Sequence, residues 1–419
     1  MKKYLSIFLV SVIVVLLVFF GSFSALAEKI TITAWHGAGG GEAKGVEEVV
    51  EKFNKQQDKI EVKLVFVEAG SVQIQKSLAA IAAGTPPDLI LLAWPQYMGP
   101  LHDALVPLDR YIAQDSKGYA KDDFIASHLL LGNSVIKGRT WGMPAETNNL
   151  ALYYNKELFK QGGVTPPKTW KELVEVAQKL TNPDKKQWGL SLPTGVGEGL
   201  TWTWMCFLWQ AGGTFTNPEQ TKLTFNTPAG VEALQFWVDL IHKYNVATLT
   251  PPQNAFLTGN VAMEINGPWS IPTIRTQSKV DLGIAPLPMY KRKATNIGGT
   301  VNIMFKTTEE RQKATWEFMK YFSGTEAQAE LGVKAGFIPV RKSSLQQPIW
   351  KEYVKEFPDI QVHIDSYEFG RYRPYGIVTY DEISQILSRH LQAALYQKES
   401  SKEALDKAVQ EAQPKVKGW

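Results

Sequence analysis

The part of the sequence that most constrains the fold runs from residue 30 to residue 93, where strand patterns and helix patterns alternate. The segment "KITITAWHG" alternates apolar and polar side chains, as a half-buried strand does, and apolar residues then recur at helical spacing from Val46 to Phe53. A second strand pattern, "IEVKLVFVEAG", is followed by a helix pattern from Ile74 to Ile81 and by a third apolar run, "LILLAW". Alternation of this kind predicts an α/β fold in which a parallel sheet is covered by helices on both faces.

The carboxyl ends of these predicted strands carry aromatic and polar side chains. Trp35 and His36 end the first strand, Glu68 follows the second, and Trp94 ends the third. Ligands of open α/β sheets bind beyond the carboxyl ends of the strands. We therefore predict that these four residues contribute to a ligand site.

The glycine-rich segment after the first strand, "GAGGGEAKG", stands where nucleotide-binding proteins carry a phosphate loop. It matches neither common motif, because Glu42 and Lys44 stand where the dinucleotide fingerprint needs glycine and Val46 stands where the phosphate loop needs lysine. Two interpretations remain. The segment is either a set of backbone N–H groups that bind hydroxyls or a small anion, or a plain turn from strand to helix.

Residues 1–27 are typical of a secretory signal peptide. Lys2 and Lys3 precede an uncharged stretch that is nearly all apolar as far as Phe20, and Ala25 and Ala27 supply small side chains at the cleavage spacing. We therefore expect cleavage after Ala27 and a soluble mature chain outside the inner membrane, in a periplasm. An uncleaved membrane anchor is the alternative, because the apolar run is slightly long for a signal peptide.

The only cysteine, Cys206, limits the covalent chemistry of the chain. A bacterial lipoprotein needs a cysteine at the cleavage site, and Cys206 lies far downstream, so we expect no lipid anchor. A single cysteine also excludes a disulfide within the chain, so the core alone must hold the fold.

The charge of the mature chain is nearly balanced. Removing Lys2 and Lys3 with the signal peptide takes the formal net charge from +4 to +2, and no basic tract occurs, so nucleic acid and anionic membranes are poor partners. The chain has 13 Trp, 15 Tyr and 19 Phe, which is more tryptophan than core packing usually requires, although a core position remains the commoner role for any one ring.

Motifs for catalysis and metal binding are missing from the sequence. The histidines are isolated, with no H-E-x-x-H pair and no cysteine partner, and no G-x-S-x-G nucleophile elbow occurs. We therefore expect no metal site, no cofactor and no catalytic residue. A carboxylate pair for glycoside hydrolysis stays open, because the 41 acidic residues allow many pairings in space.

Helices dominate the second half of the sequence, with short strand patterns at "VAMEI", "DLGIAPL" and "NIGGTVNIMF". Capping patterns mark four helix starts, at Thr169 with Glu172, Thr227 with Pro228, Thr307 with Glu310, and Ser400 with Glu403. No linker rich in Pro, Gly or Ser divides the chain. Two domains would therefore have to be interleaved, with the chain crossing between them more than once.

Several segments, taken in order along the mature chain, carry a family resemblance. They are "ITAWHG", "GTPPDLILL", "WGMPAETNNLALYYNKELF", "TWKELVEVAQKL", "GNVAMEINGPWSI", "GGTVNIMF", "GFIPV" and "RPYGIVTYDEIS". Together they resemble the extracellular solute-binding proteins of ABC importers, in the sugar-binding family that includes maltose-, trehalose- and glycerol-3-phosphate-binding proteins. The resemblance implies a monomer that captures a solute and delivers it to the permease subunits of the importer.

The same resemblance implies a two-lobed periplasmic-binding-protein fold with interleaved lobes and hinge crossings, which closes on its solute. The first lobe would take residues 28–144 and 299–338. The second lobe would take residues 145–298 and 339–419.

Matched position by position, the resemblance assigns further site residues. Trp269 in "NGPW" and Trp202 in "GLTWTW" match cleft aromatics that pack on sugar rings. Core packing is the alternative for both, and for the neighbouring Trp204. The polar and backbone positions that match ligand contacts are Asn148, Gly298, Gly299 and Arg373.

Departures from the family pattern bear on the ligand. Ala93 to Gln96 replace the acidic and arginine side chains of maltose binders, which argues against a long maltodextrin. A phosphate dianion needs several positive groups, and only Arg373 is assigned. A neutral mono- to trisaccharide is therefore the favoured ligand, glycerol-3-phosphate or a phosphodiester is the second choice, and an exported glycosidase is the distant alternative.

Overall fold

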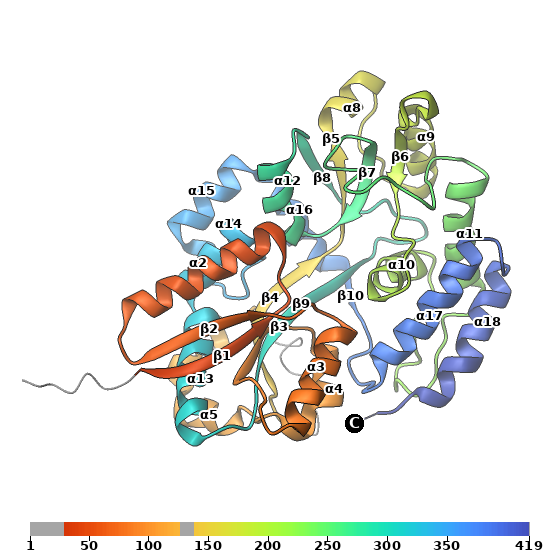
Figure 1. The fold of residues 1–419 in the computed structure, drawn as a ribbon. Helices are drawn as coiled ribbons and strands as arrows, with labels where there is room; N and C mark the ends of the chain where they lie inside the picture. Colours follow the sequence, from red (N-terminus) through yellow and green to blue (C-terminus); the bar gives the residue numbers. More distant parts are fainter. Residues whose placement is uncertain (1–28, 126–137, 419) are drawn as a thin grey trace, which may run out of the picture.

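The computed structural model describes residues 29–125 and 138–418, so the predicted signal peptide and His128 lie outside the described residues. The described chain forms two lobes, each built around its own sheet (Figure 1). The predicted two-lobed α/β fold is therefore confirmed. None of the helices described in these two ranges has the length and apolar character needed to cross a membrane.

The sheet of the first lobe runs in the order β10-β9-β3-β1-β2, with β4 also paired to β9. Its strands are β1 (Ile30–His36), β2 (Ile60–Phe66), β3 (Leu89–Ala93), β4 (Gly142–Asn149), β9 (Thr295–Met304) and β10 (Gly370–Tyr372). β1 is parallel to β2 and β3, as the alternating pattern predicts, but β9 is antiparallel to β3. The prediction of a parallel sheet is thus wrong beyond three strands, because β9 is not part of the alternating segment and enters from the other lobe.

Helices cover both faces of this sheet. They are α2 (Gly40–Gln56), α3 (Ser71–Ala82), α4 (Met98–Leu101), α5 (Asp109–Gln114), α6 (Ser116–Tyr119), α13 (Glu309–Phe322) and α14 (Thr325–Ala335). Ile32 and Ala34 of β1 are buried in a core with residues of α2, α13 and α14, whereas Trp35 packs on the opposite face with residues of α3 and α4. The alternation along the strand therefore decides which face each side chain meets.

The second lobe has a four-stranded sheet in the order β6-β7-β5-β8. Its strands are β5 (Ala151–Asn155), β6 (Trp188–Ser191), β7 (Val261–Asn266) and β8 (Leu282–Ala285). Its helices are α8 (Lys156–Gly162), α9 (Trp170–Leu180), α10 (Glu198–Gln210), α11 (Pro228–His242), α12 (Ile271–Gln277), α15 (Pro348–Glu356), α16 (Gln361–Asp365), α17 (Tyr380–Leu395) and α18 (Ser401–Ala412).

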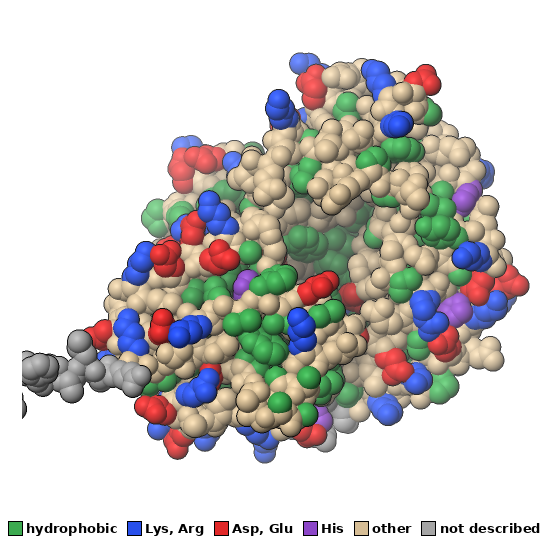
Figure 2. Space-filling view, in the orientation of Figure 1, with side chains coloured by type: hydrophobic (Ala, Val, Ile, Leu, Met, Phe, Trp, Pro, Cys, Tyr) green, Lys and Arg blue, Asp and Glu red, His purple; other side chains and the backbone are tan. Residues whose placement is uncertain are grey.

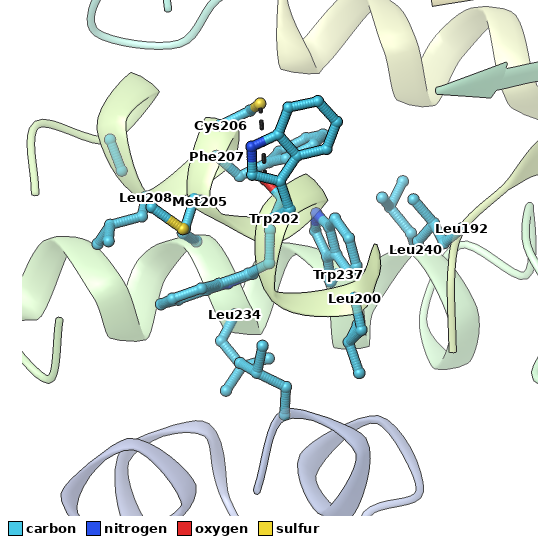
Figure 3. Close-up of a cluster of buried hydrophobic side chains, with 14 of the residues drawn as sticks. Leu192, Leu200, Trp202, Met205, Cys206, Phe207, Leu208, Leu234, Trp237 and Leu240 are labelled. Carbon is cyan, nitrogen blue, oxygen red and sulfur yellow. Dashed lines mark hydrogen bonds between the residues drawn. The ribbon is translucent and has the colours of Figure 1, made fainter. Parts of the chain in front are cut away.

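Helix α10 lies at the centre of the second lobe's largest core (Figure 3). Phe207 of α10 meets Trp237 of α11 edge to face, with ring centroids 5.3 Å apart. Trp204 and Cys206 are fully buried in this core. Trp204 therefore has the core position that the sequence offered as the alternative to a role in the ligand site. Nearly every side of α10 is therefore enclosed by protein, which fixes the position of the first turn of the helix.

Two long strands carry the chain between the lobes (Figure 1). β4 and β9 pair antiparallel along most of their lengths, from Gly142 opposite Ile303 to Asn149 opposite Ile297. The register shifts at Ala145, which is an extra residue between two paired positions. Ile338 bridges to β4 near the same place. β10, which lies in the range predicted for the second lobe, pairs with β9 in the first lobe's sheet. The three crossings and the lobe boundaries stay a prediction.

Three of the four predicted helix starts agree with the structure, at Thr169, Thr227 and Ser400. Ser400 and Glu403 form a complete capping box. The fourth prediction is wrong by one residue. Thr308 caps α13 by accepting a hydrogen bond from the Arg311 N–H, because the two adjacent threonines offer equivalent caps in the sequence.

Candidate functional site

A cavity of about 300 Å³ lies between the two lobes. Figure 2 shows this region as a hollow with hydrophobic side chains inside it. The cavity is lined by Gly37, Ala38, Glu42, Ala69, Leu92, Trp94, Glu146, Asn148, Glu198, Gly199, Trp202, Trp269, Gly299, Thr300 and Arg373. Its volume is at the small end of the range of about 300–1,000 Å³ for small-molecule sites.

Six of the ten predicted site residues line this cavity, namely Trp94, Asn148, Trp202, Trp269, Gly299 and Arg373. The other four lie close to it without lining it. Trp35 and His36 lie just before Gly37, Glu68 is exposed just before Ala69, and Gly298 packs behind the wall. A Cβ on Gly298 would lie 2.6 Å from Cζ2 of Trp202 and would also overlap Asn148, so this glycine permits close packing.

Two tryptophans form an aromatic wall. Trp202 and Trp269 have ring centroids 5.9 Å apart and are tilted by 37°. Trp269 lies in the turn η5 (Pro268–Ser270) after β7, and its ring folds back over Gly267, where a Cβ would lie 2.6 Å from Cε3 and closer to two further ring carbons. The sequence "NGPW" therefore places the indole by leaving room for it at Gly267.

The first turn of α10 carries a buried ion pair. Nη1 of Arg373 lies 2.7 Å from Oε1 of Glu198, and the two side chains are 7% and 10% exposed. Tyr380 and Ser384 of α17 donate hydrogen bonds to the same carboxylate over 3.1 and 2.5 Å. Burial opposes the charge of Arg373, but the Glu198 carboxylate, Tyr375 and Tyr380 together outweigh burial, so the pKa of Arg373 is raised.

Two further carboxylic acids, Glu42 and Glu146, line the cavity. Burial, and then the charge of Glu146, raise the pKa of Glu42 to about 8, although a hydrogen bond from the Gly39 backbone acts against the shift. Burial raises the pKa of Glu146 to about 7, against a 2.5 Å hydrogen bond donated by Asn148 Nδ2. Both groups thus titrate near neutral pH because they are desolvated.

The predictions from the sequence missed Glu42, Glu146 and Glu198. Two signals could have found the last two. Glu146 is two residues before Asn148 on the same strand, so the two share a face. Glu198 is four residues before Trp202 on the same helix, which gives the same result. Nothing in the sequence relates Glu42 to these residues.

The backbone at Leu92 is unusual for a leucine. Its φ angle is +59°, in the left-handed region that disfavours branched side chains, and the pairing of β3 with β9 is irregular between Ile90 and Ala93. The bulge allows Leu92 to line the cavity while its backbone N–H donates to Asn302 Oδ1 over 3.3 Å. Strained positions of this kind cluster at binding sites.

The lobes touch on both flanks of the cavity. On one flank the Gly41 N–H donates to Oγ1 of Thr273 over 3.1 Å. On the other flank Ser71 Oγ donates to Asp381 Oδ2 over 3.2 Å, and Arg373 reaches Gln96 over 3.2 Å. The structure is therefore a closed arrangement of the two lobes. Within the ranges 29–125 and 138–418, no group of three or more His, Cys, Asp or Glu side chains is placed to hold a metal ion.

The sequence model of the bacterial extracellular solute-binding proteins matches residues 48–358, which is most of the chain. The chain belongs to this family. Membership implies an extracytoplasmic location, and it agrees with the two lobes and the cavity between them. The relatives of this solute-binding protein described below are named for the solutes that they bind.

A maltotriose-binding protein of Pyrococcus abyssi is 26% identical over 330 residues, which cover 76% of this chain and 68% of the relative. An sn-glycerol-3-phosphate-binding periplasmic protein of Rhizobium meliloti is 25% identical over 406 residues, which cover 90% of this chain and 91% of the relative. The structure of maltose-bound MalE3 of T. maritima matches with a TM-score of 0.80 and 27% identity, over 91% of this chain and 98% of that one.

Proposed function

We propose that this solute-binding protein captures a small sugar, a mono- to trisaccharide, between its lobes and delivers it to the permease of an ABC importer. The observation that carries the proposal is the cavity, whose lining combines an aromatic wall with three acids, one amide and one arginine. A pyranose has C–H groups on its faces and hydroxyls on its edge. Indole rings therefore suit its faces, and carboxylates, Asn148 and Arg373 suit its hydroxyls.

The charge of the cavity argues against glycerol-3-phosphate, despite the relatives that bind it. Arg373 is the one basic residue in the lining, and Glu198 already neutralises it. Glu42 and Glu146 add further negative charge or, when protonated, none. A phosphate dianion would meet no free cation there, and its transfer from water would be unfavourable.

The protein acts as a monomeric carrier and not as an enzyme in this proposal. The signal peptide, residues 1–27, is removed, and the mature chain is free in the periplasm without a lipid. Burial of Cys206 in α10 supports the absence of a lipid anchor on this residue, because its thiol is enclosed by the core of the second lobe. The six predicted residues that line the cavity, together with Glu42, Glu146 and Glu198, make up the proposed binding site, and the other four predicted residues lie next to it.

Native mass spectrometry of the freshly purified mature protein tests the ligand class. A bound mass equal to one to three sugar residues is expected, and titration calorimetry with that sugar should give one site per chain. The same titration is run with glycerol-3-phosphate and with a Trp269→Ala variant. Binding of glycerol-3-phosphate and of no sugar would contradict the proposal, and shortened oligosaccharide products would show an enzyme instead.

A further inference from the structure

The cavity holds more carboxyl groups than cations. Its lining includes Glu42, Glu146 and Glu198 but only one basic side chain, Arg373. Arg373 pairs with Glu198 at 2.7 Å and donates to Gln96 over 3.2 Å from the same nitrogen, so its charge is already matched. Two acids therefore remain without a cationic partner.

These two acids come from different parts of the fold. Glu42 is in the first turn of α2, and Glu146 is on the crossing strand β4. Glu146 is 3% exposed and accepts a hydrogen bond from Asn148. No lysine or arginine contributes to the pKa of either acid, while the charge of Glu146 raises the pKa of Glu42. α2 packs on the first lobe's sheet, to which β4 also belongs, so both acids line the same small cavity.

The other charged groups near the cavity do not neutralise the negative charge of the two acids. Glu198 and Arg373 form their own pair on the α10 side, and Asp381 of α17 is hydrogen-bonded to Ser71. His36 of β1 is buried, and burial lowers its pKa, so it is neutral at pH 7. In the described part of the chain, Arg373 is thus the one basic residue of the cavity lining, and Glu198 already matches its charge.

The wall of the cavity also holds an unpaired hydrogen-bond acceptor. Oδ1 of Asn148 has no donor within the described part of the chain, and it packs against Gly298, where an added Cβ would overlap it. It belongs to the side chain that donates to Glu146, and Asn148 is only 8% exposed. Buried acceptors without donors are unfavourable, and an N–H or O–H group of a solute that reached Oδ1 would relieve this.

We propose that the solute is an amino sugar whose protonated amino group lies between Glu42 and Glu146. An ammonium group supplies three donors and a positive charge, which compensates two carboxylates that would otherwise repel each other. The aromatic wall of Trp202 and Trp269 packs on the sugar ring in the same way as for a neutral sugar. The inference rests on the proposed function and specifies the chemical class of its ligand.

The experiment uses matched sets of ligands with the mature protein. Glucosamine, galactosamine and mannosamine, with their N-acetyl forms and parent hexoses, are titrated by calorimetry at pH 5, 6 and 7. At least one amine should bind about tenfold or more tightly at pH 7 than its acetylated and parent forms, which is the low end for a desolvated charge pair. Its affinity should rise with pH by about tenfold per unit for each proton that the two acids release.

Variants separate the two acids from a general effect of charge. Glu42→Gln and Glu146→Gln should each remove most of the preference for the amine and reduce proton release, measured in buffers of different ionisation enthalpy. Glu264→Gln is the matched control. Burial also raises the pKa of Glu264 to about 7, but this residue lies outside the cavity lining, so the preference should persist.

Two results would overturn the inference, and they differ. If neutral or acetylated sugars bind as tightly as the amines, with no dependence on pH between 5 and 7, the amino-sugar inference fails while the proposed function stands. If no sugar of any class binds in the calorimeter or is found by native mass spectrometry, the proposed function fails, and the inference fails with it.

Discussion

Replacing Gly267 by alanine should weaken sugar binding as much as removing the Trp269 ring, because the indole occupies the space that a Cβ at position 267 needs. The backbone at Gly267 has φ −122° and ψ 173°, which alanine adopts without strain, so the new methyl group conflicts with the ring and not with its own backbone. The Cβ would lie 2.6 Å from Cε3 of Trp269 and closer to two other ring carbons. The ring must therefore rotate out of the aromatic wall.

The magnitude follows from the role of the ring. A central aromatic anchor contributes about 2–4 kcal/mol to binding, so the dissociation constant should rise roughly 30- to 700-fold. Trp269 is only partly buried, and the free energy of unfolding should change by less than about 1 kcal/mol. Calorimetric titration with the native sugar measures the first quantity, and urea unfolding measures the second.

Two comparisons make the result decisive. Gly195→Ala is the matched control, because position 195 is exposed and a Cβ there has nothing within 4 Å. The double variant with Trp269→Ala should bind no more weakly than Trp269→Ala alone, since the methyl group acts only through the ring. Normal affinity of Gly267→Ala with an unchanged unfolding curve would refute the placement of Trp269 in the site.

Further predictions concern stability, pH and shape. Trp316→Ala should lower the free energy of unfolding by about 3–5 kcal/mol with little effect on sugar affinity, since Trp316 is 3% exposed in the first lobe and stacks on a tyrosine 5.4 Å away. Glu198→Ala should cost about 3–5 kcal/mol in urea unfolding because it leaves Arg373 buried without its partner, whereas Glu232→Ala at an exposed pair should cost under about 1 kcal/mol. The pKa of Glu42 is raised from about 4.5 in the unfolded chain to about 8 in the fold, so its contribution to stability is complete below pH 4.5 and is lost as the pH rises through 8. The ligand-free protein should therefore become less stable between about pH 5 and 8.5. Glu42→Gln should flatten this profile in thermal unfolding. Small-angle scattering should show a smaller radius of gyration with sugar than without it, and an unchanged profile at saturation would mean that the sugar touches only one lobe.

The sequence predicts the first lobe well where the pattern is local. The alternation of β1, α2, β2, α3 and β3 follows from side-chain periodicity, and each of these elements forms where expected. The antiparallel entry of β9 could not be predicted in this way, because it depends on contacts between segments about 200 residues apart. The prediction of helix caps is wrong only at α13, where Thr307 and Thr308 are two equivalent candidates.

The site shows a similar limit. The rule that ligands bind at strand ends identified the correct edge of the sheet, but the cavity is lined by Gly37, Ala38 and Ala69, one to three residues after the predicted Trp35, His36 and Glu68. Side chains alternate between faces along a strand, so an error of one residue selects the wrong face. The proximity of Glu42 to Glu146 depends on how α2 and β4, which are far apart in the sequence, pack in the first lobe, and no local pattern records that.

The crossing strands have a consequence for engineering. β4 and β9 connect the lobes, and they also supply Glu146, Asn148, Gly299 and Thr300 to the cavity. Gly299 has a φ of +143°, which other residues adopt only with strain, so a substitution there alters the bend of the strand as well as the wall of the cavity. A biosensor that reports on lobe movement would therefore be retuned most safely from Trp202 on α10 and Trp269 on η5. Changes in the two strands would alter the selectivity and the switching rate of such a sensor together.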